Sequence, residues 1–318
     1  MSTREIYGNR IRPQARRAIQ PLVFLLMLQV GAGKAAAQND PDHKEWVQLF
    51  NGKDLKDWDV KISGYALNDN YGDTFRAENG VLKVAYDKYQ QFDSRFGHIF
   101  YRQKFSYYVI AVEYHFLGNQ TPGGPEWGFR NSGIMVHSQS AQSMLKDQDF
   151  PISIEVQLLG GPGTGSRPTA NLCTPGTNVE YKGKLYTEHC LQANAKTYHG
   201  DQWVRVEAVV LGDEKIRHVV EGEIVLEYSK PQIGGENVTN FNSAEKQDGK
   251  LLTEGYIALQ AESHPLEFRK VELLNLVGCM DPKARNFKSY YVKADNSKCE
   301  YSAGRAPKTR RGGGTPIP

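Results

Sequence analysis

The chain has 318 residues, of which 39% are hydrophobic and 24% are charged, so it can hold one large domain or two smaller ones. Its 39 basic and 36 acidic residues give a formal net charge of +3, and several of the basic residues lie near the two ends. The body of the chain is therefore close to neutral, which argues against a nucleic-acid partner.

The first 37 residues have the parts of a secretory signal peptide. Four arginines between Arg10 and Arg17 precede a short apolar stretch, Ile19–Val30, and Ala35–Ala37 supply small residues at a cleavage point. The apolar stretch is shorter than the ~20 residues of a membrane-spanning helix, which disfavours a permanent anchor. We therefore expect no stable membrane span and an exported protein, periplasmic or secreted, that starts near Gln38.

All four cysteines follow the expected cleavage point. An even number of cysteines in an oxidising compartment favours disulfides, although four cysteines allow three connectivities. Neither local pair has the C-x-x-C spacing of a zinc site. We predict the local pairs Cys173–Cys190 and Cys279–Cys299.

Most of the remaining chain consists of short runs that predict β-strands. Phe75–Val84 carries Asn79 and Gly80 at its centre, which is the strongest short-range signal for a β-hairpin. Residues rich in Gly, Pro, Asn and Asp separate the other runs, and no stretch sustains a helical period. We therefore predict an all-β sandwich or jelly roll, with a long loop over residues 160–198. The other predicted strands are His98–Tyr101, Tyr107–Phe116, Ser132–His137, Ile152–Leu158, Trp203–Leu211, Ile216–Val220, Ile224–Tyr228, Tyr256–Ala261 and Leu266–Leu274.

The last part of the chain has a different character. Residues 278–301 contain two of the cysteines and several Asp and Asn residues, which predicts a small disulfide-closed loop. This loop is either a stapled surface cap or a calcium-stabilised loop that uses Asp281, Asn286 and Asp295. Residues 302–318 are rich in Gly, Pro and Arg and are expected to be disordered.

Three predicted strands carry polar side chains on the face opposite their apolar residues. In Ile152–Leu158, alternation places Glu155 and Gln157 on one face and the aliphatic residues on the other. The same alternation groups Gln260, Glu262 and His264 on the second strand. On the third strand it groups Asn131 with His137. A solvated sheet face would also show this pattern, but its repetition on three strands favours a polar groove, and such side chains transfer protons and bind hydroxyl groups.

One familiar sugar-hydrolase signature is not present. Laminarinase-like jelly rolls use Glu-x-Asp-x-x-Glu on a strand, and here Gln157 and Gly160 stand where the Asp and the second Glu would be. A retaining mechanism needs two carboxyl groups about 5 Å apart, so local sequence disfavours double-displacement hydrolysis.

Four motifs together resemble the family once called DUF1080, now named for 3-keto-disaccharide hydrolase, or 3-keto-glucoside 1,2-lyase and 3-keto-2-hydroxy-glucal hydratase, activity. The resemblance covers residues 46–277 and implies a concanavalin A-like jelly-roll β-sandwich that cleaves 3-keto-glycosides. The motifs are Leu49–Trp58 (LFNGKDLKDW), Arg130–Ile134 (RNSGI), Ile154–Gly161 (IEVQLLGG) and Ala261–Arg269 (AESHPLEFR).

The implied reaction assigns roles to these polar residues. A ketone at C3 acidifies the hydrogen at C2, so a base removes it, the C1 oxygen leaves, and water adds back. Glu155 is the candidate base, with Glu262 or His264 as acid. A divalent metal held by these three residues is an alternative.

The chemistry requires an upstream sugar 3-oxidoreductase to make the 3-keto substrate. The rival function is a non-catalytic carbohydrate-binding module. The candidate substrate-binding residues are Arg130, Asn131, His137, Gln157, Gln260 and Arg269.

Overall fold

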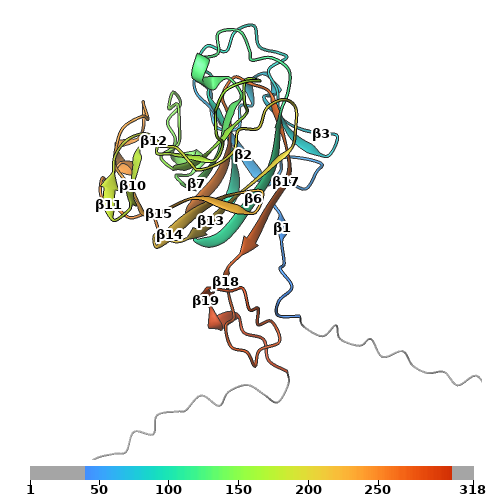
Figure 1. Cartoon of the computed structure of the whole chain (residues 1–318), viewed down its shortest axis with the longest axis vertical. Coiled ribbons are helices and arrows are strands. Elements are labelled where there is room, and N and C mark those ends of the chain that lie inside the picture. The colour runs from blue at the N-terminus through green and yellow to red at the C-terminus, as the bar shows by residue number, and fades with distance from the viewer. Residues whose placement is uncertain (1–39, 303–318) are drawn as a thin grey trace, which may run out of the picture. The chain divides into compact units, whose positions relative to one another are not determined.

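The computed structural model of the protein describes residues 40–302. Within this range the regular structure is mostly β-strand, and the strands form two sheets that pack face to face (Figure 1). The predicted signal peptide, residues 1–37, lies outside the described residues, as does the predicted disordered tail beyond Ser302. In the described part of the chain, no helix is long and apolar enough to cross a membrane.

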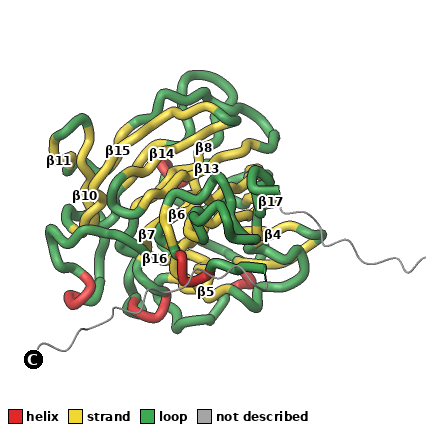
Figure 2. Tube along the Cα trace, turned by 90° about the horizontal axis from the view of Figure 1, so that it is seen from below, coloured by secondary structure: helices red, strands yellow, loops and turns green. Residues whose placement is uncertain are grey.

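The larger sheet has ten antiparallel strands in the order β11-β10-β15-β14-β13-β6-β17-β4-β3, with β1 beside β17. Strands β10 and β11 lie at one edge and β3 and β4 at the other (Figure 1, Figure 2). The strand bounds are β1 Val47–Gln48, β3 Phe75–Glu78, β4 Val81–Val84, β6 Tyr107–Phe116, β10 Thr177–Tyr181, β11 Lys184–Tyr186, β13 Val204–Leu211, β14 Lys215–Val220, β15 Glu223–Ile233 and β17 Leu266–Asn275.

The smaller sheet has seven antiparallel strands in the order β12-β9-β8-β7-β16-β5-β2. A separate parallel pair, β18 Val277–Gly278 and β19 Lys293–Ala294, belongs to the C-terminal loop. The strands of the smaller sheet are β2 Trp58–Ile62, β5 Gly97–Phe105, β7 Asn131–Ser138, β8 Ile154–Leu159, β9 Asn171–Cys173, β12 Cys190–Leu191 and β16 Gly255–Ala261. Short 3-10 turns complete the described structure, at Tyr71–Asp73, Glu126–Gly128, Ala141–Ser143, Ser243–Glu245 and Asn296–Lys298.

The core lies between the two sheets because strands of both alternate buried and polar residues. Strand β13 is buried at every second position, and its apolar side chains join one cluster with Ile154, Val156 and Leu158 of β8. Alternation along a strand sends the intervening residues to the opposite face. The predicted all-β jelly-roll sandwich is confirmed. The predicted strand Tyr107–Phe116 matches β6.

The hairpin predicted at Asn79 and Gly80 is also confirmed. Strands β3 and β4 pair directly across these two residues, whose φ angles are 51° and 81°. Positive φ at both central residues is the turn geometry that Asn-Gly favours.

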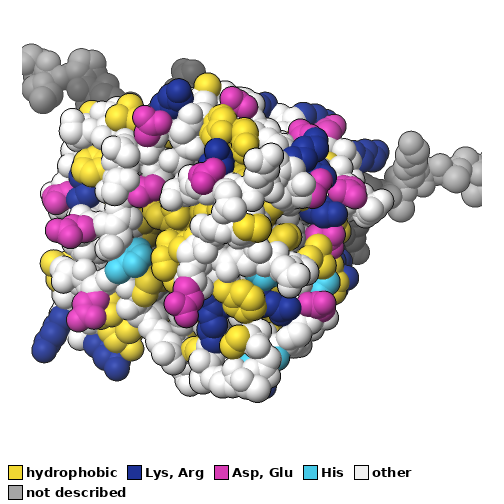
Figure 3. Space-filling model, turned by 90° about the horizontal axis from the view of Figure 1, so that it is seen from above, with side chains coloured by type: hydrophobic (Ala, Val, Ile, Leu, Met, Phe, Trp, Pro, Cys, Tyr) yellow, Lys and Arg dark blue, Asp and Glu magenta, His cyan; other side chains and the backbone are white. Residues whose placement is uncertain are grey.

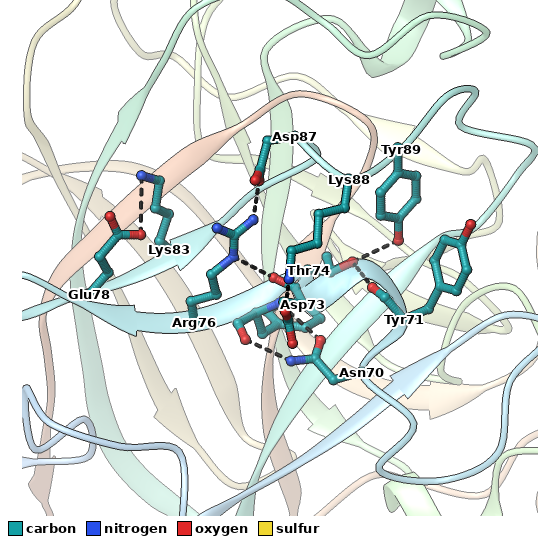
Figure 4. A network of polar contacts seen from close by, with 11 residues as sticks. Asn70, Tyr71, Asp73, Thr74, Arg76, Glu78, Lys83, Asp87, Lys88 and Tyr89 are labelled. Carbon is teal, nitrogen blue, oxygen red and sulfur yellow. Dashed lines mark hydrogen bonds and ion pairs between the residues drawn. The ribbon is translucent and has the colours of Figure 1, made fainter.

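The loop before this hairpin is fastened by side chains (Figure 4). Asn70 donates to Phe75 O at 2.7 Å and accepts from Phe75 N at 3.0 Å, so one amide fixes the start of β3. The Thr74 and Tyr89 hydroxyls lie 2.6 Å apart. Ion pairs such as Arg76 with Asp87 then cover this edge of the larger sheet.

Residues 160–198 are not the simple loop that the sequence predicts. They contain β9, β10, β11 and β12, of which β9 and β12 extend the smaller sheet and β10 and β11 extend the larger. These strands are two to five residues long, which is too short for the alternation of side chains to identify them in the sequence.

Both predicted disulfides are confirmed. Cys173–Cys190 joins the paired strands β9 and β12, and Cys279–Cys299 closes the C-terminal loop. The first disulfide therefore fixes the edge of the smaller sheet, and the second fixes a loop beyond the sandwich.

Each of the three predicted calcium ligands contacts a donor group of the protein. The Asp281 carboxylate accepts from the Tyr301 hydroxyl at 2.8 Å, and Asn286 Oδ1 accepts from a backbone N–H at 3.0 Å. Asp295 pairs with the ammonium group of Lys298 at 2.9 Å. These side chains already bind protein donors, so the structure favours the stapled cap over the calcium loop.

Candidate active site

A pocket of about 640 Å³ opens on the outer face of the smaller sheet, the face turned away from the core. This volume is in the range of small-molecule sites. Figure 3 shows one face of the molecule, on which apolar side chains gather near the centre among scattered acidic, basic and histidine side chains. The pocket is lined by Trp127, Asn131, Asp149, Phe150, Glu155, Gln157, Leu159, Arg167, Cys173, Pro175, His189, Cys190, Asn237, Thr239 and Glu262.

Glu155 enters the pocket from β8, on the face opposite its core residues, as alternation predicts. Its side chain lies across Gly133 of β7, where an added Cβ would be only 2.6 Å from Glu155 Oε1. Glycine at this position therefore leaves room for the carboxyl group. Glu155 is only 6% exposed, and burial raises the pKa of its carboxyl to about 8.

Glu262 follows β16 and reaches the same pocket. It is 3% exposed, and its Oε2 atom is buried without a hydrogen-bond partner. Burial, and then the negative charge of Glu155, raise the pKa of Glu262 well above its ordinary value. When Glu155 loses its proton, its negative charge keeps Glu262 protonated, so this pair can both accept and donate a proton.

Arg167 supplies a positive charge beside the pair, and the sequence did not identify it as a site residue. Its guanidinium donates to the carbonyls of Gly160 at 2.7 Å, Arg130 at 3.0 Å and Trp127 at 3.3 Å. Burial lowers the pKa of Arg167, whereas the nearby charge of Glu262 raises it. The one sequence feature that could have pointed to Arg167 was its position in the long segment after Gly160.

Two predicted amides also line the pocket. Asn131 Nδ2 donates to Trp127 O at 3.2 Å, while Asn131 Oδ1 is buried without a partner. Gln157 Oε1 accepts from Asn171 Nδ2 at 3.0 Å. Asn131 and Gln157 are therefore held in place with polar atoms left for a ligand. Gln260 lies on the same face of the sheet but is fully buried and does not line the pocket.

His264 does not share the face of Glu262, and this part of the prediction is wrong. Strand β16 ends at Ala261, and Ser263 has a φ of 80°, so the alternation of the strand does not extend to His264. The His264 ring packs at 5.6 Å from Phe116 and 5.1 Å from Phe129. Burial lowers the pKa of His264 to about 4, so the ring stays neutral, and it does not line the pocket.

His137 also lies outside the pocket, contrary to the sequence prediction. Its own φ of 49° and an irregularity between Tyr256 and Ala258 in the β16–β7 ladder break the alternation. His137 Nε2 lies 2.9 Å from Gly212 O, in the turn between β13 and β14.

The two predicted arginines are engaged elsewhere. The Arg130 guanidinium donates to Gly200 O at 2.7 Å and to Asp201 at 3.1 Å. Arg269 lies on β17 of the larger sheet, 2.6 Å from the Glu113 carboxylate and 4.1 Å above the Trp203 ring. Neither side chain lines the pocket, and their roles in holding substrate are not supported by this geometry.

The proposed metal ligands do not form a set. Glu155 and Glu262 share the pocket, but His264 packs among aromatic rings. Among residues 40–302, the one group of His, Cys, Asp and Glu side chains whose ligand atoms lie within 4.8 Å of one another is Cys173, His189 and Cys190. Both sulfurs of that group are in the disulfide.

Several solved structures resemble the chain weakly. Two candidate glycosyl hydrolases from Parabacteroides distasonis ATCC 8503 are 18% and 17% identical, with TM-scores of 0.45 and 0.44. Each covers 73% of this chain, and the match spans 94% and 100% of those chains. The carbohydrate-binding module CBM66 from Bacillus subtilis is 9% identical with a TM-score of 0.35, over 57% of this chain and 82% of that chain. No curated protein is significantly similar to the chain.

A family model gives the stronger result. The 3-keto-alpha-glucoside-1,2-lyase-like domain matches residues 45–274, well over half of the chain. This match includes every residue that lines the pocket. The chain belongs to the family of 3-keto-alpha-glucoside-1,2-lyase-like domains and is a carbohydrate-active protein.

Proposed function

We propose that the protein cleaves 3-keto-glycosides by elimination across C1 and C2 followed by hydration, which amounts to net hydrolysis. The observation that carries this proposal is the pair of buried carboxyl groups, Glu155 and Glu262, in one pocket, where the charge of Glu155 raises the pKa of Glu262. Elimination needs a base for the C2 hydrogen and an acid for the leaving oxygen, and such a pair supplies both.

Glu155 acts as the base because its pKa, about 8, is close to physiological pH, and its charge, once formed, keeps Glu262 protonated as the acid. It takes the C2 proton, the C1–oxygen bond breaks, and the C1=C2 double bond forms while Glu262 gives its proton to the leaving oxygen. Water then adds to C1 and returns a proton to Glu262, and Glu155, whose proton has meanwhile exchanged with solvent, protonates C2. The Arg167 guanidinium and the amides of Asn131 and Gln157 bind the keto oxygen and stabilise the enolate.

Ordinary glycoside hydrolysis is a second candidate. The sequence argument against it was the missing local carboxylate, but Glu262 brings a second carboxyl group from a distant strand. An ionised and a protonated carboxyl in one pocket also suit a retaining mechanism. This function would cleave unoxidised glycosides as well.

A non-catalytic carbohydrate-binding module is the third candidate. Trp127 is 52% exposed at the pocket, and its ring stacks at 5.6 Å on Phe96. An exposed aromatic ring of this kind can cover the apolar face of a sugar. Such a module needs no titrating pair, so Glu155→Gln would leave its function intact.

We further propose that the protein is exported and acts after a sugar 3-oxidoreductase. All four cysteines form disulfides, which supports an oxidising compartment. An oxidoreductase is needed because glycosides do not carry the C3 ketone until a hydroxyl group is oxidised.

Paired substrates separate the three functions. The mature chain is incubated with a 3-keto-glucoside and with its unoxidised parent, with and without divalent metal, while free aglycone and enone absorbance are followed. Release from the keto sugar alone is the expected result. Release from both sugars would favour ordinary hydrolysis, and binding without release would favour the carbohydrate-binding module.

A further inference from the structure

Half of the buried polar atoms without partners lie in or beside the pocket. Among residues 40–302, twelve buried side-chain nitrogen and oxygen atoms have no hydrogen-bond partner, and six of them belong to His98, Asn131, Gln260 and Glu262. Asn131 and Glu262 line the pocket, whereas His98 and Gln260 do not. Buried polar groups nearly always have partners, so this cluster points to a partner from outside the chain.

His98 and Gln260 lie directly behind the carboxyl pair. They face each other across β5 and β16, and each is 0% exposed. Gln260 comes two residues before Glu262. The neighbouring Leu259 pairs with Ile134, which places Gln260 beside Gly133, the residue that Glu155 covers. The unpartnered groups are therefore continuous with the pocket along the sheet.

The ring of Phe150 lies beside both the pocket and the His98 ring. It lines the pocket on one side, and its centroid lies 5.9 Å from the His98 ring on the other. The backbone before it is fixed, because Lys61 Nζ donates to Lys146 O at 2.7 Å and Thr239 donates to Asp149 at 2.8 Å. The Phe150 ring packs on Phe96 at 4.8 Å between ring centroids, so a change of rotamer would exchange this contact without moving the backbone.

We propose that His98 and Gln260 form a closed compartment of the pocket that takes hydroxyl groups of the sugar ring, and that the Phe150 ring turns aside to admit them. This inference rests on the proposed function. An amide and a neutral imidazole each offer a donor and an acceptor, which matches adjacent hydroxyl groups. The charged neighbour, Lys61, is already bound to the carbonyls of Ile62 and Lys146, so the compartment suits a neutral polyol better than an anion.

The test measures binding and stability in the same variants. The probe is 1,5-anhydro-3-keto-glucitol, which has no leaving group at C1 and so cannot be cleaved. In Gln260→Leu and His98→Leu, calorimetry should show affinity about tenfold weaker, because each variant loses hydrogen bonds to the sugar. The unfolding temperature should stay the same or rise, since an apolar side chain replaces unpartnered polar atoms.

His115→Leu is the matched control. Both ring nitrogens of His115 are also buried without partners, but the residue lies on β6 of the larger sheet, 5.0 Å from the Trp203 ring. This variant should bind the probe like the wild type. Equal loss of affinity in all three variants would overturn the inference.

Two further results would also overturn it. One is a Gln260→Leu variant that binds the probe with unchanged affinity but unfolds at a lower temperature. That result would mean that His98 and Gln260 bind internal water and not the sugar. The other is absence of probe binding by the wild type.

Phe150→Ala leaves both polar groups in place and should raise the association rate constant for the probe. An unchanged rate constant would refute the role of the Phe150 ring. Failure of the proposed function would look different from failure of this inference, because the wild type would then bind a 3-keto-glucoside without cleaving it.

Discussion

The two sheets carry their charged side chains in different ways. On the larger sheet, charges occur in close pairs at the surface, such as Arg269 with Glu113 at 2.6 Å and Arg205 with Glu272 at 2.9 Å. These side chains remain partly exposed, so water and the partner both stabilise the charge. Pairs of this kind contribute little to stability but keep the sheet face solvated.

The smaller sheet also has an ion pair, Arg102 with Asp59 at 2.9 Å, but in its pocket two acidic groups are buried close together. Glu155 and Glu262 are almost fully buried, and the charge of one raises the pKa of the other. Such an arrangement destabilises the fold, and similar perturbed carboxyls cluster at functional sites. Comparison of the two sheets therefore separates side chains that support the fold from those that carry chemistry.

The largest expected effect is on the carboxyl pair. Glu155→Gln should lower kcat/KM for a 3-keto-glucoside by about 10³-fold, because the base is lost. The unfolding temperature should not fall, since a buried ionisable group is removed. Glu113→Gln on the larger sheet is the matched control and should keep full activity. Equal losses of kcat/KM in Glu155→Gln and Glu113→Gln would contradict the view that the smaller sheet carries the chemistry and the larger sheet does not.

The next effect concerns Arg167. Arg167→Met should lower activity at least about tenfold and stability by about 2 kcal/mol, because three backbone carbonyls lose their donor and Glu262 loses its nearby positive charge. Steady-state kinetics and urea unfolding measure the two effects. Wild-type activity in a folded Arg167→Met variant would remove the arginine from the site.

The carboxyl pair should also make stability depend on pH. The folded pKa of Glu155, about 8, is above its ordinary value of 4.5. The unfolded chain therefore loses this proton first, and stability should fall as pH rises from about 4.5 to 8, by at most about 1.4 kcal/mol per pH unit. Urea unfolding across this range should show a shallower decline in Glu155→Gln. An unchanged slope would mean that Glu155 ionises freely in the folded protein.

The smallest effect is expected on the larger sheet. Arg269→Ala removes the ion pair with Glu113, and this should lower the free energy of unfolding by less than about 1 kcal/mol, without a change in kcat/KM. A loss of activity in this variant would restore the substrate-binding role that the sequence analysis gave to Arg269.

Regular strands made much of this arrangement predictable. Alternation along β8 placed Glu155 and Gln157 opposite the core, and Asn79 with Gly80 located a hairpin. The even cysteine count predicted two disulfides, and the choice of local pairs among three connectivities was correct. In each case a local rule acts on neighbouring residues, so sequence alone contains the needed information.

Prediction failed where the backbone leaves the regular pattern. Positive φ at Ser263 and His137 turned two histidines away from the pocket, and neither residue type demands that conformation. Arg167 reaches the pocket only because the segment after Gly160 folds back, which depends on tertiary contacts. The sequence therefore predicted the carboxyl pair better than its surroundings.

Deuterium incorporation tests the central claim most directly. A 3-keto-glucoside is cleaved in D₂O and the free sugar is analysed by mass spectrometry, with the product alone in D₂O as the control for spontaneous exchange. Elimination with Glu155 as the base predicts one deuterium at C2, because the proton returned to C2 comes from a carboxyl group that exchanges with solvent. Cleavage that leaves the C2 hydrogen in place would contradict this mechanism and point to direct displacement at C1.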